Sequence, residues 1–304
     1  MTTSSSSSVP PWDEARAGAV EGGVSDFFQL LKPRVMTLVV FTGFAGLALA
    51  PGHLHPFLAT VATLCIAIGA GASGAINMWY ERDVDAIMSR TKNRPLPKGR
   101  VAPADALGFG VVLTILSVGL MGVAINWVAA ALLALASFFY VFVYTIWLKR
   151  RTPQNIVIGG AAGAFPPVIG WAAVTGHVSF EPVMLFMLIF MWTPPHFWAL
   201  ALYKNADYKA AGIPMLPTVA GADATKRQIM IYSVLLTPFA LAPYFMGVAG
   251  LVYLALAAVL HGIFMIGAWR VMTDTTFKSA QRLFGYSIFY LFALFALMMF
   301  DKAG

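Results

Sequence analysis

Charged residues are scarce in this chain: they make up 11% of its 304 residues, whereas hydrophobic residues make up 59%. A soluble domain has roughly 25% charged residues. The composition, with a mean hydropathy of +0.76, therefore excludes an ordinary soluble fold and a disordered chain. Cysteine is scarcer still, because Cys65 is the single one, which excludes an intrachain disulfide and a cysteine-based zinc or iron–sulfur site.

Apolar segments of about 20 residues, the length of a bilayer crossing, recur along the chain. They predict an all-α membrane protein with nine transmembrane helices in one domain, residues 26–304. We expect Pro166 and Pro167 to break the fifth span. Residues 1–25 are rich in serine and contain no apolar core of signal-peptide length, so we expect a disordered tail there. The predicted spans are 35–52, 57–80, 105–124, 127–148, 155–174, 182–203, 228–247, 250–269 and 282–300.

The basic residues lie almost entirely on one side of these spans. If Arg282 at the start of the last span is included, that side holds all of the 20 Lys and Arg residues except Lys302. The positive-inside rule places this side in the cytoplasm with the N-terminus, and the C-terminus opposite. The net charge of +7 is thus a topology signal, and we expect membrane lipid and no nucleic acid as a partner. The acidic residues near the N-terminus argue against a transit peptide and favour a bacterial inner membrane.

The densest polar cluster follows the second span and contains Asn77, Glu81, Asp83 and Asp85. In a helix, residues four apart lie on one face, so Asn77, Glu81 and Asp85 share a face while Asp83 points elsewhere. Oxygen ligands of this kind suit Mg²⁺, which usually holds a substrate phosphate as well. The alternative is a solvated helix end whose acids are neutralised by nearby Arg and Lys residues.

The next loop, residues 90–98, is basic and contains Arg90, Lys92 and Arg94. Planar guanidinium groups are suited to phosphate oxygens. The same residues are also what the positive-inside rule alone would place there. On the sequence, both readings of this loop stay open.

A second polar cluster follows the sixth span and contains Tyr203, Lys204, Asp207 and Lys209. If the helix continues, Tyr203 and Asp207 share a face. Asp207 would then be a further metal ligand, and the two lysines would hold phosphate. Together with the first cluster, on the same side of the membrane, this segment predicts a site for a phosphorylated substrate.

His196 lies inside the sixth span, directly after Pro194 and Pro195. An ionisable side chain at this depth is a functional candidate. We expect the two prolines to break the backbone, as happens where a helix lines a cavity. Three roles stay open for His196: an axial haem ligand, a proton-transfer group and a hydrogen-bonded packing residue.

The motif Asn77-xxx-Glu81-xxx-Asp85, nine spans and a second polar motif after the sixth span resemble the UbiA superfamily of intramembrane prenyltransferases. Within it, three stretches are similar to the protohaem IX farnesyltransferases, or haem O synthases. The resemblance covers roughly residues 26–300, and the Leu31-Lys-Pro-Arg34 entry to the first span also fits. The three stretches are Asn77 to Leu96, Thr193 to Leu202, and Asp207 to Pro217.

The resemblance implies a UbiA-type bundle that transfers farnesyl from farnesyl diphosphate to a vinyl group of haem B. It implies that Mg²⁺ and the diphosphate are held by Asn77, Glu81, Asp85 and Asp207, and that these residues with Lys204 form the catalytic set. His196 would hold the haem. The family also suggests haem A synthase or oxidase assembly proteins as partners. The remaining implied substrate contacts are Arg34, Asp83, Arg90, Lys92, Arg94, Tyr203 and Lys209.

The chain departs from the family pattern at Glu81, where Asp is usual. Glu keeps the carboxylate and adds a methylene, so the metal sits differently or Asp83 shares the role. Two alternatives stay open: a UbiA-type enzyme with another aromatic or tetrapyrrole acceptor, and a haem or isoprenoid transporter. Broken helices with a histidine near the midplane would suit the transporter, whereas acids clustered at one membrane face favour the enzyme.

Overall fold

The computed structural model describes residues 22–303, and the regular secondary structure of these residues is helical apart from one isolated antiparallel bridge between Ala249 and Lys302. Residues 1–21 of the predicted tail lie outside the described residues, and Val24 and Ser25 already belong to a helix. The elements are α2 (Val24–Leu30), α3 (Pro33–Leu49), α4 (Pro56–Tyr80), α5 (Arg82–Ile87), α6 (Pro103–Ala124), α7 (Trp127–Phe138), the π-helix η2 (Phe139–Leu148), α8 (Asn155–Thr175), α9 (Phe180–Tyr203), α10 (Asn205–Ala210), α11 (Leu216–Val219), α12 (Gly221–Phe245), α13 (Leu251–Thr273) and α14 (Lys278–Phe300).

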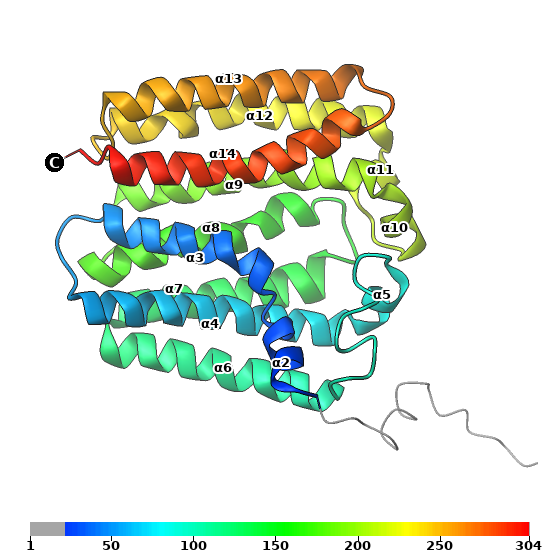
Figure 1. The fold of residues 1–304 in the computed structure, drawn as a ribbon, viewed down its shortest axis with the longest axis horizontal. Helices are drawn as coiled ribbons and strands as arrows, with labels where there is room; N and C mark the ends of the chain where they lie inside the picture. The colour runs from blue at the N-terminus through cyan, green and yellow to red at the C-terminus, as the bar shows by residue number, and fades with distance from the viewer. Residues whose placement is uncertain (1–21, 304) are drawn as a thin grey trace, which may run out of the picture.

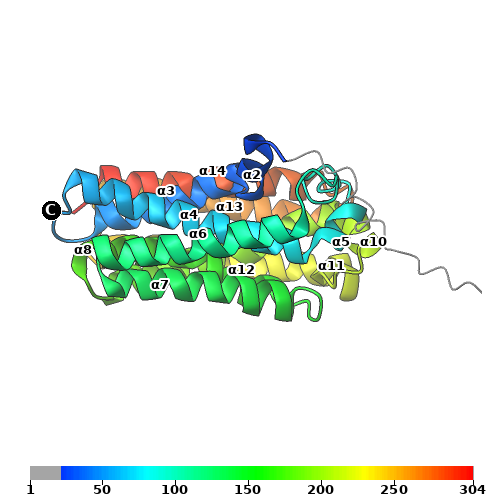
Figure 2. The same ribbon diagram turned by 90° about the horizontal axis from the view of Figure 1, so that it is seen from below.

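The long helices run side by side, as Figures 1 and 2 show. In the described part of the chain, eight helices are long and apolar enough to cross a membrane, and the pair α2 and α3, bent by 56°, brings the number to nine if it is one span. The chain is therefore a multi-pass membrane protein, and the prediction of nine spans is confirmed on this count. Helix α12 begins at Gly221, before the predicted span, because its polar first turns extend the helix beyond the apolar segment.

The expectation that prolines break two of the spans is wrong. Helix α8 runs without interruption through Pro166 and Pro167, and α9 runs through Pro194 and Pro195. Proline has a helical φ, but it lacks the N–H of the helical hydrogen bond and its ring crowds the carbonyl of the preceding turn. Membrane helices tolerate this loss because neighbouring helices and local adjustments satisfy the freed carbonyls.

Helices α3 and α8 pack with their backbones in direct contact. A Cβ atom added at Gly46 would lie 2.1 Å from the carbonyl oxygen of Pro167, and one added at Gly170 would lie 2.0 Å from that of Gly43. Any larger residue at Gly46 or Gly170 would push the two helices apart. Small residues thus let membrane helices approach closely, and this contact joins the first span to the fifth.

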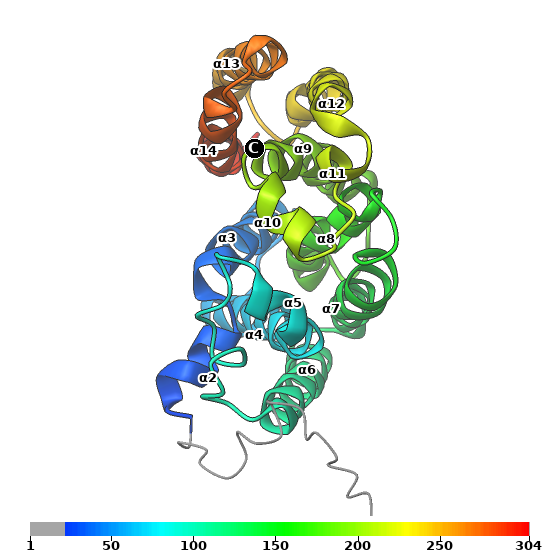
Figure 3. The same cartoon turned by 90° about the vertical axis from the view of Figure 1, so that its right-hand side faces the viewer.

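The two ends of the bundle differ in composition. The short helices α5, α10 and α11 gather at one end, and the C-terminus lies at the other (Figure 1). Viewed from the first end, these helices and the loop after α5 cover the ends of the long helices (Figure 3). Both polar sequence motifs are therefore carried to the same end.

The end that carries the C-terminus is held by the last residues of the chain. The side-chain Oδ2 of Asp301 accepts the N–H of Tyr253 at 2.7 Å, and its backbone carbonyl accepts the N–H of Gly250 at 2.7 Å. Asp301 thereby caps the N-terminus of α13. The Nζ of Lys302 donates to the carbonyls of Ala48 and Ala50 at 3.0 and 3.1 Å, where a cation is favourable at the C-terminus of α3.

We expect Asp301→Ala to lower the stability of the protein by about 1 kcal/mol, the usual effect of removing a cap. Thermal unfolding of the protein in detergent measures this loss. Asp105→Ala is the control, because Asp105 is an exposed acid in the first turn of α6, and it should change stability by less than about 0.5 kcal/mol. Equal effects of the two substitutions would contradict the capping role.

Candidate active site

The first polar motif keeps a helical course past the end of α4. The N–H of Glu81 donates to the carbonyl of Asn77 at 3.0 Å, and the N–H of Asp85 donates to that of Glu81 at 2.8 Å. Residues 77, 81 and 85 therefore follow the spacing of one helix face, although the backbone bends slightly at Glu81 between α4 and α5. All three side chains are buried, with relative exposures of 2%, 2% and 4%.

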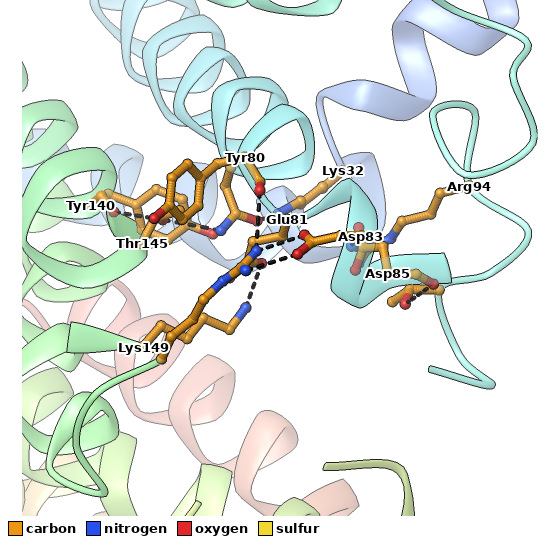
Figure 4. A network of polar contacts seen from close by, with 12 residues as sticks. Lys32, Tyr80, Glu81, Asp83, Asp85, Arg94, Tyr140, Thr145 and Lys149 are labelled. Carbon is orange, nitrogen blue, oxygen red and sulfur yellow. Dashed lines mark hydrogen bonds and ion pairs between the residues drawn. The ribbon is translucent and has the colours of Figure 1, made fainter. Parts of the chain in front are cut away.

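Asn77 is fixed by Lys32 and Thr145, which come from two other parts of the chain and are labelled in Figure 4. Its Oδ1 accepts a hydrogen bond from the Nζ of Lys32 at 2.6 Å, and its Nδ2 donates to the Oγ1 of Thr145 at 3.0 Å. Lys32 joins α2 to α3 with a left-handed φ of 52°, which is uncommon for a residue that is not glycine. This turn directs the side chain of Lys32 into the site.

Thr145 belongs to the π-helix η2, the second half of the fourth span. Its hydroxyl donates to the carbonyl of Tyr140, five residues earlier, at 2.8 Å. The wider turn of a π-helix leaves this carbonyl accessible to a side chain, and such turns are frequent at functional sites. Thr145 thereby connects η2 to Asn77 on α4.

Glu81 forms an ion pair with Lys149, the residue that follows η2. Burial lowers the pKa of Lys149, but the charge and hydrogen bond of Glu81, together with Tyr144 and Tyr140, hold this pKa above its usual range. The ion pair uses only Oε2 of Glu81. The other oxygen, Oε1, is buried and has no hydrogen-bond partner, and a buried polar atom of this kind calls for a ligand.

Asp85 is paired with the loop that follows α5. Its Oδ2 lies 2.7 Å from Nη1 of Arg94. The Oγ1 of Thr91 donates to the backbone carbonyl of Asp85 at 2.9 Å. These contacts fold the basic loop back onto the motif, so Arg94 lies against Asp85.

Asp83 points away from the row formed by Asn77, Glu81 and Asp85. Both of its oxygens accept from the guanidinium of Arg150, at 2.6 and 2.8 Å. The hydrogen bonds from Arg150 hold the pKa of Asp83 below its usual range. This pair is open to solvent, since the side chain of Asp83 is 62% exposed.

The second polar motif is joined to the first by one hydrogen bond. The Oγ of Ser89, in the loop after α5, donates to Oδ2 of Asp207 on α10 at 2.6 Å. Beside them, the Nζ of Lys204 lies 6.0 Å from the centre of the Tyr203 ring. Four further predicted substrate contacts are exposed: Arg34 at the start of α3, and Arg90, Lys92 and Lys209.

Within residues 22–303, no three His, Cys, Asp or Glu side chains lie close enough together to hold a metal ion. Asp207 accepts a hydrogen bond from Ser89, while Glu81 and Asp85 form ion pairs with Lys149 and Arg94. The alternative interpretation of the first motif, a solvated helix end, correctly predicts that cations neutralise its acids. Glu81 and Asp85 are buried, however, so this helix end is not solvated. The donors still suit Mg²⁺, because they are amide and carboxylate oxygens and Oε1 of Glu81 is unused.

His196 is enclosed between α9 and α14. Its Nδ1 lies 2.6 Å from the Oγ of Ser287, and its ring stacks on Trp192 and Phe284 with centroids 4.3 and 4.6 Å away. Phe284 also contacts the ring of Tyr203 edge-on at 6.1 Å. Aromatic contacts therefore connect His196 to the second polar motif.

Sequence reasoning missed the partners that hold these acids in place. In the sequence, Lys32 stands out only as part of the entry to the first span, and the positive-inside rule alone accounts for Lys149 and Arg150. Nothing in the sequence marks Ser89, Thr145 or Ser287. Which residue pairs with each acid depends on how helices far apart in the sequence pack together, and a local sequence pattern does not show this.

The UbiA prenyltransferase family model matches residues 39–296. The chain belongs to this family. It is a prenyltransferase enzyme, so the transporter alternative is set aside. The chain is 59% identical to the protoheme IX farnesyltransferase of Rhizobium rhizogenes, over 95% of this chain and 92% of that protein. It is 60% identical to the enzyme of the same name from Parvibaculum lavamentivorans, over 92% and 90%.

Solved structures share the fold. A structure of digeranylgeranylglyceryl phosphate synthase has a TM-score of 0.76 at 17% identity and covers 91% of this chain and 98% of that one. The UbiA homologue of Archaeoglobus fulgidus bound to DMAPP and Mg²⁺ has a TM-score of 0.62 at 16% identity and covers 90% and 99%. The predicted UbiA-type helical bundle is confirmed.

The adjacent residues Lys149 and Arg150 allow a matched test of burial at this site. Lys149→Met leaves the buried Glu81 carboxylate without its cation, so we expect a loss of stability of about 3 kcal/mol. Arg150→Met removes an exposed pair and should cost less than about 1 kcal/mol. Thermal unfolding in detergent compares the two variants, and an equal loss would show that Glu81 is not buried as described.

Proposed function

We propose that this chain transfers the farnesyl group of farnesyl diphosphate to a vinyl group of haem B with addition of water, giving haem O and diphosphate. The observation that carries the proposal is the buried row of Asn77, Glu81 and Asp85 at the end of an apolar bundle, joined to Asp207 through Ser89. The names of relatives about 60% identical to the chain support farnesyl and protohaem as the substrates.

Mg²⁺, when bound, neutralises the charge that develops on the departing diphosphate. We assign its ligands to Asn77, Glu81, Asp85 and Asp207. The unpaired Oε1 of Glu81 supports this choice. The homologue from Archaeoglobus fulgidus, whose structure is described as bound to DMAPP and Mg²⁺, supports a divalent metal.

The basic residues around this row bind and orient the diphosphate. We propose that Arg94 and Lys204 contact its oxygens, because Arg94 lies against Asp85 and Lys204 lies beside Tyr203. Asp83 is held by Nη1 and Nη2 of Arg150, so we propose that it acts through this pair by fixing α5. The exposed cations Arg34, Arg90, Lys92 and Lys209 extend the positive field and draw the anionic substrate to this end.

The reaction breaks the bond between C1 of the farnesyl group and the diphosphate oxygen, and the electron pair leaves with diphosphate. The allylic carbon then bonds to the terminal carbon of a vinyl group. Water adds to the cation left beside the porphyrin ring and releases a proton. The apolar helices exclude other water, which would otherwise capture the allylic cation too early.

We assign the acceptor side of the site to His196, which lies above Tyr203 on α9 with Phe284 in contact with both rings. An enzyme of this family with another aromatic or tetrapyrrole acceptor would share the diphosphate half. We further propose a bacterial inner membrane with the site and N-terminus on the cytoplasmic side. Haem A synthase or oxidase assembly proteins are the proposed partners that take the product.

The reaction is tested by incubating the purified protein with haem B, farnesyl diphosphate and Mg²⁺. Mass spectrometry should find a product heavier than haem B by one farnesyl group plus one hydroxyl group. The product should be absent when EDTA is added and return with excess Mg²⁺. If no such product forms from protein that binds haem, haem B is not the acceptor.

Asp85→Ala should abolish this product, because it removes a metal ligand and frees Arg94 from its partner. Asp105→Ala is the matched control, since Asp105 is an exposed acid in the first turn of α6 and should leave the rate unchanged. Product formation is compared at saturating substrate and equal amounts of folded protein. Normal turnover by Asp85→Ala would remove the metal role of this residue.

A further inference from the structure

Two buried histidines lie inside the membrane-spanning helices, and they differ in how their nitrogens are used. For His261 on α13, Nε2 is 2.8 Å from the Oγ1 of Thr237, and Nδ1 is 2.9 Å from the hydroxyl of Tyr290. Both of its nitrogens have a partner. In the described part of the chain, His196 forms a hydrogen bond only through Nδ1, with Ser287.

The partner of His196 determines which nitrogen carries the proton. The Oγ of Ser287 donates its single proton to the carbonyl of Phe284 at 2.7 Å. Toward His196 this oxygen can then only accept, so the proton of the neutral imidazole is on Nδ1. Nε2 therefore keeps its lone pair.

The ring of His196 is also fixed in orientation. Trp192 and Phe284 stack on it with interplanar angles of 18° and 22°. The indole N–H of Trp192 donates to the backbone carbonyl of Ser287 at 2.9 Å, which locks the stacked ring to the same turn of α14. The imidazole thus has little freedom to rotate, and its unused nitrogen points in one direction.

Metal-binding histidines almost always donate their other ring N–H to a fixed acceptor, which sets the tautomer and raises the basicity of the ligating nitrogen. Resting on the proposed function, we infer that Ser287 is a positioning residue that holds His196 in the Nδ1–H form, so that Nε2 ligates the iron of the haem substrate. The acceptor is thereby bound through α9 and α14, away from the carboxylates that bind diphosphate.

The test uses the purified full-length protein in detergent with ferrous haem B and no farnesyl diphosphate. Wild type should show the iron–histidine stretching band in its resonance Raman spectrum. His196→Ala should lose the band and bind haem about 10-fold or more weakly, and added imidazole should restore the band. Ser287→Ala should keep the haem bound but shift the band to lower frequency, because the ligand is no longer a hydrogen-bond donor to Oγ.

Two controls separate ligation from packing. His261→Ala removes a buried histidine whose nitrogens are both engaged, and it should leave the band and the haem affinity unchanged. Metal-free protoporphyrin IX has no iron to ligate, so it should bind to wild type and His196→Ala with similar affinity. A loss of protoporphyrin binding in His196→Ala would show a packing role and overturn the inference.

The remaining outcomes are equally decisive. An iron–histidine band that persists in His196→Ala would assign the ligand to another residue, and an unshifted band in Ser287→Ala would remove the positioning role. Either result is compatible with continued haem O formation by wild type, so the inference can fail alone. Absence of both haem binding and product in wild type would instead contradict the proposed function.

Discussion

The buried carboxylates of Glu81 and Asp85 determine how the end of the bundle that carries α5 and α10 is built. A buried negative charge is costly unless a cation or a metal ion lies beside it. The cations around Glu81 and Asp85 come from different parts of the chain, since Lys149 follows the fourth span and Arg94 lies in the loop after α5. The ion pairs of the two acids therefore hold η2 and this loop against the end of α4. The hydrogen bond from Lys32 to Asn77 likewise holds the bend between α2 and α3 against α4.

The sequence was sufficient to predict the helices and the shared face of the first motif, because both follow from short-range periodicity. It was insufficient for the partners. Lys149 and Arg150 are neighbours with the same charge, yet they bind different acids, Glu81 and Asp83. Successive residues leave a helix end in different directions, and which acid each one meets depends on how η2 crosses α4. Only the packed structure contains that information.

The errors at the prolines have a related cause. In water, a proline inside a helix usually ends or bends it, but Pro166 and Pro194 lie in helices enclosed by other helices, where unfolding a turn would expose more carbonyls to lipid. In a membrane, the rule that proline ends a helix is therefore weaker than in water. The π-helix shows the opposite case, because no residue pattern predicts the wider turn that gives Thr145 access to the carbonyl of Tyr140.

The charges at the two ends of the bundle serve different purposes. At the end that carries the C-terminus, Asp301 and Lys302 are engaged with the termini of α13 and α3, so these charges stabilise the fold. The other end carries exposed cations such as Arg90 and Lys209, together with a buried oxygen of Glu81 that has no partner. A substrate with a diphosphate head and an apolar tail suits this second end, because the head meets unused charge while the tail stays among the helices.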